Sequence, residues 1–187
     1  MDQQLEASIL GMWVFLVTEV MFFGGLFLAY IVYRTMYPEA WVAGSNHLNV
    51  YMGGLNTAVL ICSSLTMVLA VAAAQKRDDR GTTLWLTVTG LLGATFVGGQ
   101  VYEFTAFVKE GLGYTTNIFS SAFYTLTGFH GVHVSVGVIL LLSTMGIIRK
   151  NRITGNKAEV VEMVGLYWHF VDIVWIVIFT LVYLIPA

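Results

Sequence analysis

Charged residues are scarce in this sequence. Asp, Glu, Lys and Arg make up 11% of its 187 residues, while 57% are hydrophobic; soluble domains contain roughly 25% charged residues. A chain with so little charge cannot cover itself with a water-exposed surface, so a lipid bilayer is its natural solvent. The basic residues form no stripe outside two short loops, and nucleic acid is not expected as a partner.

Cysteine is nearly absent as well. The single cysteine, Cys62, lies inside an apolar run, which excludes an intramolecular disulfide and a zinc-type cysteine cluster. The N-terminal segment 1–6 lacks the positive charges of a cleaved signal peptide. The apolar run that follows is too long for such a peptide, so we expect it to remain as a membrane span.

Long apolar runs are what the sequence has in abundance. Each exceeds the roughly 20 residues that cross a hydrocarbon core of about 30 Å. Bare backbone polar groups are not tolerated in lipid, and the alternation typical of barrel strands is missing, so the runs are predicted to be helices. The sequence therefore predicts an all-α membrane bundle of five transmembrane helices in a single domain, 1–187. The predicted spans are 9–33, 50–74, 84–108, 118–147 and 163–185.

The basic residues indicate the orientation of these spans, because positive loops stay on the cytoplasmic side. All nine Lys and Arg lie outside the five runs. The loops after the second and fourth runs contain Lys76, Arg77, Arg80, Arg149, Lys150, Arg152 and Lys157. The opposite side contains only Arg34 and Lys109. The N-terminus is predicted to be cytoplasmic and the C-terminus outside.

Six ionisable residues lie inside the spans, where their cost in free energy makes each a candidate for function. They are Glu19, Glu103, His130, His133, His169 and Asp172. A helical rise of about 1.5 Å per residue puts five of them in the cytoplasmic half of the membrane and Glu103 near the outer interface. His130 and His133 share one helix face, as do His169 and Asp172. A metal or haem site and a hydrogen-bonded network between helices are both open interpretations.

Glu19 has three interpretations from the sequence: a proton-relay carboxylate, a hydrogen-bonded structural group, or a neutral acid that faces lipid. Its neighbours in the chain are apolar, so the sequence names no partner for it. Glu103 is expected to be a structural residue at the interface. Asn56 and Gln100 are expected to bridge helices through hydrogen bonds.

Several short motifs resemble subunit III of the haem–copper oxidases. Thr18–Phe23 resembles the membrane glutamate motif of that family, and the two strongest signatures are the histidine-containing segments 127–133 and 167–175. Weaker similarities lie at Leu55-Asn56-Thr57 and at Tyr102-Glu103-Phe104. The motifs occur in the family's order from about residue 9 to the end of the chain.

This resemblance implies a subunit without haem, copper or catalytic residues, in contact with subunit I, other oxidase subunits and membrane phospholipid. Haem and copper are then expected in the partner subunits. The implied roles are support of proton uptake and protection of the active site during turnover, in a bacterial cytoplasmic (inner) membrane. Glu19 becomes a proton-linked or otherwise functional carboxylate, and Arg149 resembles a residue that meets lipid phosphate. The implied structural polar network consists of His130, His133, His169, Asp172, Glu103 and Asn56.

The chain departs from the longer form of this family, which has two further helices at the start. One wall of that form's lipid cleft is therefore absent. Subunit III of a quinol oxidase and an accessory subunit of a nitric oxide reductase are alternatives, although Tyr167-Trp168-His169 leans toward a cytochrome c oxidase. From other classes, an intramembrane haem or metal protein that uses the histidines and a small proton-coupled transporter around Glu19 and Asp172 are the competing hypotheses.

Overall fold

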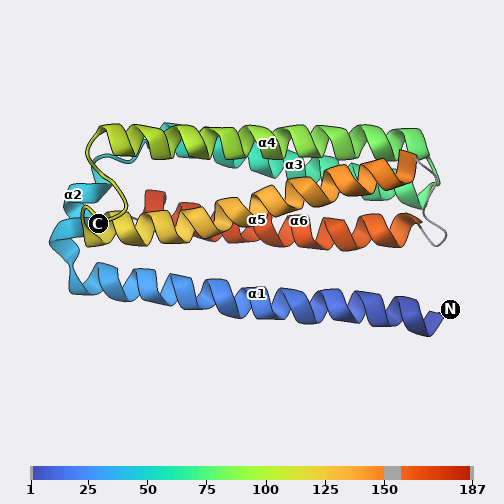
Figure 1. The fold of residues 1–187 in the computed structure, drawn as a ribbon, viewed down its shortest axis with the longest axis horizontal. Coiled ribbons are helices and arrows are strands. Elements are labelled where there is room, and N and C mark those ends of the chain that lie inside the picture. Colours follow the sequence, from blue (N-terminus) through green and yellow to red (C-terminus); the bar gives the residue numbers. More distant parts are fainter. Residues whose placement is uncertain (1, 150–156, 186–187) are drawn as a thin grey trace.

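A computed structural model describes the backbone of residues 2–149 and 157–185 and the side chains of residues 7–149 and 158–185. Every regular element in these ranges is a helix (Figure 1). The helices are α1 (Asp2–Met36), α2 (Pro38–Ser45), α3 (Val50–Gln75), α4 (Asp79–Lys109), α5 (Ile118–Arg149) and α6 (Lys157–Phe179), followed by a π-helical turn, η1 (Thr180–Leu184).

Five stretches of these helices are long and apolar enough to cross a membrane, which confirms the predicted fold class. They are Ala7–Met36, Val50–Gln75, Asp79–Lys109, Ile118–Arg149 and Ala158–Leu184. The orientation of the termini stays a prediction. The basic side chains of Lys150, Arg152 and Lys157, on which part of that prediction depends, lie outside the described residues.

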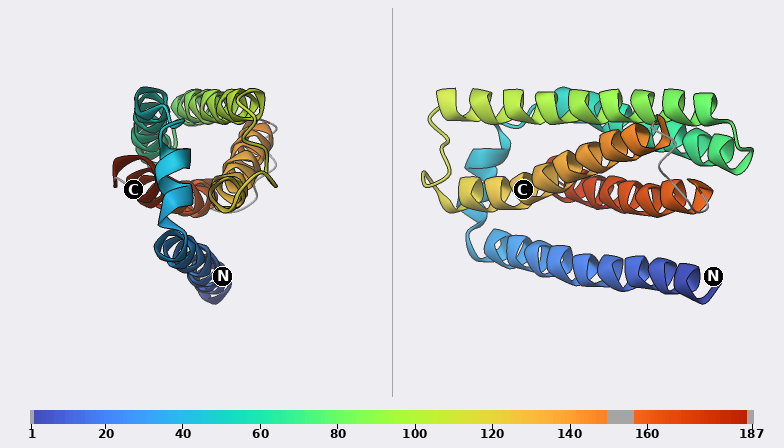
Figure 2. Two further views of the ribbon diagram at one scale, coloured as in Figure 1. Left: turned by 90° about the vertical axis from the view of Figure 1, so that its left-hand side faces the viewer. Right: turned by 45° about the vertical axis from the view of Figure 1, so that its right-hand side comes forward.

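Helices α3, α4, α5 and α6 form a four-helix bundle, and α1 lies outside it (Figures 1 and 2). The end-on view of Figure 2 shows α1 beneath the layer of α5 and α6, with α3 and α4 on the far side. The contacts of α1 are accordingly with α5, α6 and α2. Helix α1 is as apolar as the other spans, but it packs on the outside of the bundle and is not one of its four helices.

Trp168 of α6 occupies the centre of the bundle and is 1% exposed. Its indole N–H donates to the hydroxyl of Ser63 on α3 (3.0 Å). A Cβ atom added at Gly93 of α4 would lie 2.4 Å from this ring, and one added at Gly137 of α5 would lie 2.9 Å from it. The two glycines thus let one large side chain contact three neighbouring helices, as small residues do at membrane helix interfaces.

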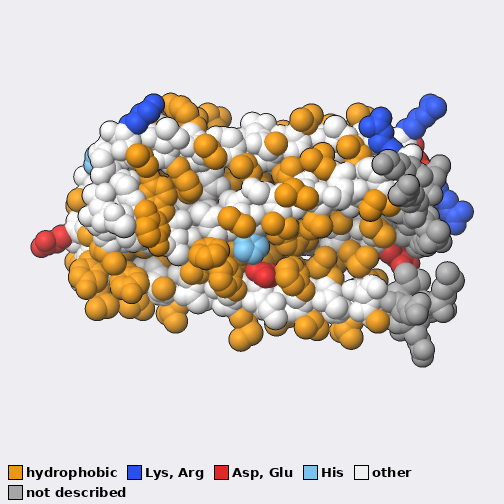
Figure 3. All heavy atoms as spheres, in the orientation of Figure 1, with side chains coloured by type: hydrophobic (Ala, Val, Ile, Leu, Met, Phe, Trp, Pro, Cys, Tyr) orange, Lys and Arg blue, Asp and Glu red, His pale blue; other side chains and the backbone are white. Residues whose placement is uncertain are grey.

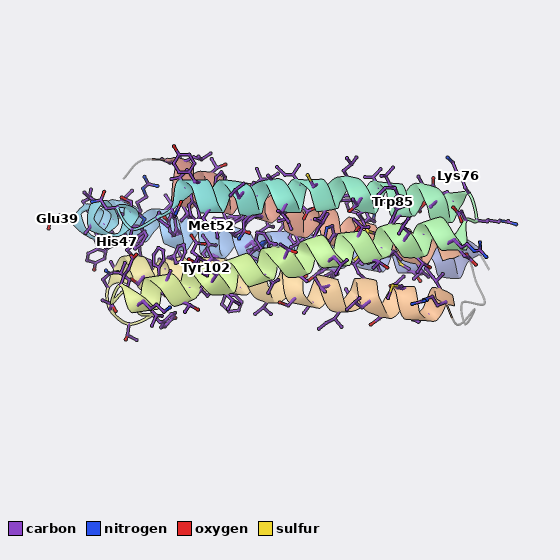
Figure 4. The ribbon with its side chains drawn as sticks, turned by 90° about the horizontal axis from the view of Figure 1, so that it is seen from above. Glu39, His47, Met52, Lys76, Trp85 and Tyr102 are labelled. Carbon is purple, nitrogen blue, oxygen red and sulfur yellow. The ribbon has the colours of Figure 1, made fainter. Side chains whose placement is uncertain are left out.

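The short helix α2 was not among the predicted elements. Pro38 lies in its first turn, where the missing N–H costs no hydrogen bond. Trp41 anchors it in the bundle, with ring centroids 5.4 Å from Tyr30 and 5.6 Å from Phe119. Figure 4 shows Glu39 and His47 at this end of the molecule and Lys76 at the opposite end. The end that holds α2 is the one predicted to face outside.

Candidate functional site

Glu19 of α1 and His133 of α5 form a dyad in the middle of two spans. Glu19 Oε2 lies 3.0 Å from His133 Nε2. The other ring nitrogen, Nδ1, lies 2.7 Å from the carbonyl oxygen of Phe129. A carbonyl oxygen only accepts, so Nδ1 must bear the hydrogen of that bond. One proton is then left between Nε2 and Oε2, bound to either atom, and the dyad is neutral as a whole in both cases.

Aromatic rings surround this dyad. The imidazole centroid of His133 lies 5.0 Å from the ring of Phe23 and 6.1 Å from that of Phe22. The hydroxyl of Tyr167 donates to the backbone carbonyl of His133 (3.0 Å). The two side chains are still 17% and 18% exposed. Figure 3 shows a histidine and an acidic side chain side by side in the middle of an otherwise hydrophobic face.

His169 and Asp172 of α6 lie toward α3. His169 Nδ1 is 2.8 Å from the hydroxyl of Ser64. Ser64 also approaches Asp172, but neither carboxylate oxygen has hydrogen-bond geometry with any described residue. Asp172 is only 5% exposed. A buried carboxyl group without such bonds is costly in the ionised form.

His130 is fully buried and packs against two aromatic rings. Its centroid lies 4.9 Å from that of Trp175, in a stacked arrangement, and 5.6 Å from that of Phe96. Within the described part of the chain, neither of its ring nitrogens has a hydrogen-bond partner. His130 and His133 are three residues apart, yet one packs in the bundle core and the other pairs with α1.

The remaining polar candidates lie between helices. Tyr183 of η1 donates its hydroxyl to Glu103 Oε1 of α4 (2.7 Å), and both residues are buried. Gln100 donates to the carbonyl of Thr127 on α5 (2.6 Å). Asn56 of α3 lies against Gly99 of α4, where an added Cβ would be 2.3 Å from its amide oxygen.

Arg149 lies at the last turn of α5, beside a surface hollow of about 670 Å³ between α4 and α5. Arg80 and Asp79 line the same hollow from α4, together with Thr83, Thr87 and the apolar side chains of Leu84 and Ile148. Two arginines against one acid leave this hollow with an excess of positive charge beside apolar side chains, which suits an amphiphile with an anionic head.

The polar residues expected in one membrane layer are thus distributed among different helix interfaces. Among residues 7–149 and 158–185, no three His, Cys, Asp or Glu side chains gather closely enough to hold one metal ion. The absence of a metal or haem on this chain stays a prediction. Ser64 and Tyr183 were not predicted as partners, because the sequence does not show which neighbouring helix a hydroxyl in an apolar run faces.

The comparisons with known proteins agree with the resemblance noted in the sequence. Residues 5–186 match the family described as cytochrome c oxidase subunit III. The chain is 41% identical over 184 residues to a cytochrome c oxidase subunit 3 of Thermostichus vulcanus, which covers 96% of this chain and 88% of the relative. It is 42% identical over 184 residues to one of Synechocystis sp., covering 96% and 76%. It is 38% identical over 177 residues to one of Corynebacterium diphtheriae, covering 94% and 86%.

Proposed function

The chain belongs to the cytochrome c oxidase subunit III family, and from this premise we propose that it is the non-redox subunit of a proton-pumping haem–copper terminal oxidase. Membership means that it works in a complex with other oxidase subunits. The observation that carries the proposal is the family match over residues 5–186, on a chain with five membrane-long helices. We further propose subunit I as its main contact and the bacterial inner membrane as its location.

The arrangement of the histidines supports a subunit that binds neither haem nor copper. His133 pairs with Glu19, His169 pairs with Ser64, and His130 packs against two aromatic rings. The three histidines thus lie against different neighbours, whereas a metal needs several ligands around one point. The relatives are named cytochrome c oxidase subunits, which favours cytochrome c over quinol as the electron donor of the complex.

Removal of this chain from the gently purified complex tests the assignment. We expect the haem and copper content per remaining partner subunit to be unchanged, because the cofactors belong to the partners. The measurement is a visible spectrum and a metal analysis of both fractions. Haem or a stoichiometric metal that leaves with this chain would overturn the proposal in favour of a cofactor site at the histidines.

The proton-linked role is assigned to the Glu19–His133 dyad. It holds one proton between two side chains inside the membrane, and both side chains are partly exposed. An electrostatic or proton-buffering group of this kind, close to subunit I, would support proton uptake and sustained turnover. Membrane phospholipid is the partner proposed for the hollow beside Arg149, with the phosphate near the two arginines.

Glu19→Gln is the matched test, because the amide keeps the size of the side chain and a hydrogen bond to Nε2 but cannot hold the proton. We expect the complex to assemble normally and to show slower proton uptake or earlier inactivation during turnover. Both are measured with the complex in proteoliposomes. Glu39→Gln, at an exposed position of helix α2, serves as the control. If Glu19→Gln leaves uptake and durability unchanged, Glu19 has no proton-linked role.

A further inference from the structure

The pairing of Tyr183 with Glu103 is not used by the proposed function. The phenol donates to Glu103 Oε1 at 2.7 Å, and each residue is 7% exposed. Two further tyrosines are near: Tyr124 interacts electrostatically with Glu103, and Tyr30 with Tyr183. Glu103 thus forms a buried pair with one phenol, with two further tyrosines nearby. Among the side chains that the structure describes, Asp172 is the only other acid buried to this extent.

The chemistry of a phenol depends on what accepts its proton. Removing one electron from a tyrosine makes its hydroxyl proton strongly acidic, so oxidation is easiest where a base already holds that proton in a hydrogen bond. The carboxyl oxygen of Glu103 accepts this bond at 2.7 Å, and in its ionised form the group is such a base. The hydroxyl of Tyr124 instead donates to backbone carbonyl oxygens, which do not take up a proton. Among these tyrosines, Tyr183 is the one equipped for oxidation coupled to proton transfer.

Aromatic rings link Tyr183 to the surface of the molecule. The centroid of Tyr183 lies 6.5 Å from that of Phe123, which lies 5.7 Å from that of Tyr124. Tyr124 in turn lies 6.4 Å from Tyr114, a residue in the loop after α4 that is 56% exposed. Rings at this spacing are close enough for electron exchange, and Tyr114 is the exposed end of this series.

We propose that Tyr183 and Glu103 form a radical trap that removes oxygen-derived one-electron oxidants from the complex. The inference depends on the proposed function, since an oxygen-reducing partner must supply the oxidant. In the first step the oxidant takes one electron from Tyr183, whose proton moves to Glu103, leaving a neutral tyrosyl radical and a carboxylic acid. In the second step Tyr114 gives an electron to Tyr183 and its proton to water, and Tyr183 recovers its proton from Glu103. A water-soluble thiol then reduces the Tyr114 radical by donating a hydrogen atom.

The test is to expose the purified complex to dilute hydrogen peroxide in the presence of a nitrone spin trap. Mass spectrometry of the peptides of this chain then locates the trapped radicals. Tyr51 provides an internal comparison, because it is 89% exposed and lies in none of these ring contacts. If Tyr183 passes the radical to Tyr114, we expect several times more adduct at Tyr114 than at Tyr51. If oxidants in the solvent attack exposed tyrosines directly, the more exposed Tyr51 should carry more adduct.

Variants distinguish oxidation of Tyr114 through Tyr183 from direct oxidation of Tyr114 because it is exposed. Tyr183→Phe keeps the ring and removes only the hydroxyl, and Glu103→Gln removes the base; each is expected to lower the adduct at Tyr114 several-fold. Tyr51→Phe, the matched control, leaves the adduct at Tyr114 unchanged. Adduct at Tyr114 that survives Tyr183→Phe, or that does not exceed the adduct at Tyr51, overturns the inference. Co-purification of haem subunits in the same preparation is scored separately, so a failed oxidase assignment is distinguishable from a failed trap.

Discussion

Tryptophan N–H groups and small hydroxyls are paired across α3 and α6. Trp168 donates to Ser63 (3.0 Å) and Trp175 donates to Thr57 (2.9 Å), and all four side chains are buried. Hydrogen bonds of this kind between membrane helices contribute on average about 0.6 kcal/mol, so they orient the helices more than they stabilise them. The larger effect at residue scale is steric, since Trp168 fills the space left by glycines on two other helices.

Gly93→Ala is predicted to destabilise the bundle. The new methyl group would lie 2.4 Å from Trp168 Cη2, and the ring cannot withdraw because it is buried and hydrogen-bonded to Ser63. Overpacking of this kind costs about 1–3 kcal/mol. The midpoint of unfolding in detergent, followed by circular dichroism, measures the loss.

Gly98→Ala on the same helix is the control for Gly93→Ala. Nothing lies within 4 Å of an added Cβ at this position. Alanine favours a helix by about 1 kcal/mol relative to glycine, so this variant should be neutral or slightly stabilised. Equal unfolding midpoints for the two variants would contradict the steric role assigned to Gly93.

Helix α1 is attached to the rest of the molecule at two levels. The Glu19–His133 dyad connects it to α5 in the middle of the span. Near its end, Arg34 donates to the carbonyl oxygens of Leu181 and Ile185 (3.1 Å each). Leu181 lies in the π-helical turn and Ile185 directly follows it, and carbonyls at the end of a helical segment are left without intrahelical partners. Between these points α1 exposes large apolar side chains, including Met21 (73% exposed) and Leu28 (64% exposed).

Arg34→Ala is predicted to loosen the end of α1 together with η1. Both carbonyl acceptors lose their donor, and a cation near a helix C-terminus contributes about 0.3–1 kcal/mol. Hydrogen–deuterium exchange of the peptides that contain residues 30–36 and 180–185 should be faster than in the unmodified chain. Arg149→Ala, in the last turn of α5, is the matched control and should leave both peptides unchanged. Exchange that is unaffected by Arg34→Ala would show that α1 is held by its other contacts alone.

For the molecule as a whole, local hydropathy predicted the elements that matter most. Apolar runs in a membrane protein have to be helices, so five runs were enough to indicate five long helices. The short helix α2 was missed because its eight residues form no apolar run, and η1 because a π-helical turn has no sequence pattern of its own.

The pairs of side chains within the candidate site could not be predicted from the sequence, because they depend on how each helix is rotated about its own axis. Glu19 and His133 are 114 positions apart and meet only because α1 packs against α5. His130 and His133 share a helix and a depth but face different environments. Depth in the membrane therefore predicted one common layer of polar residues. In the structure these side chains point toward different neighbouring helices.

The orientation of the whole molecule is the remaining prediction, and it depends on charge at the two ends. Figure 3 shows more Lys and Arg side chains at one end than at the other. The end with Lys76, Arg77, Arg80 and Arg149 is predicted to be cytoplasmic by the positive-inside rule.

In a Cys62→Ser background, a membrane-impermeant maleimide should label Glu39→Cys in intact cells. It should label Lys76→Cys only after the membrane is opened, since these two positions lie at opposite ends (Figure 4). The reverse pattern would place the N-terminus outside and move the hollow beside Arg149 to the outer face, away from the anionic cytoplasmic leaflet that its arginines are predicted to meet.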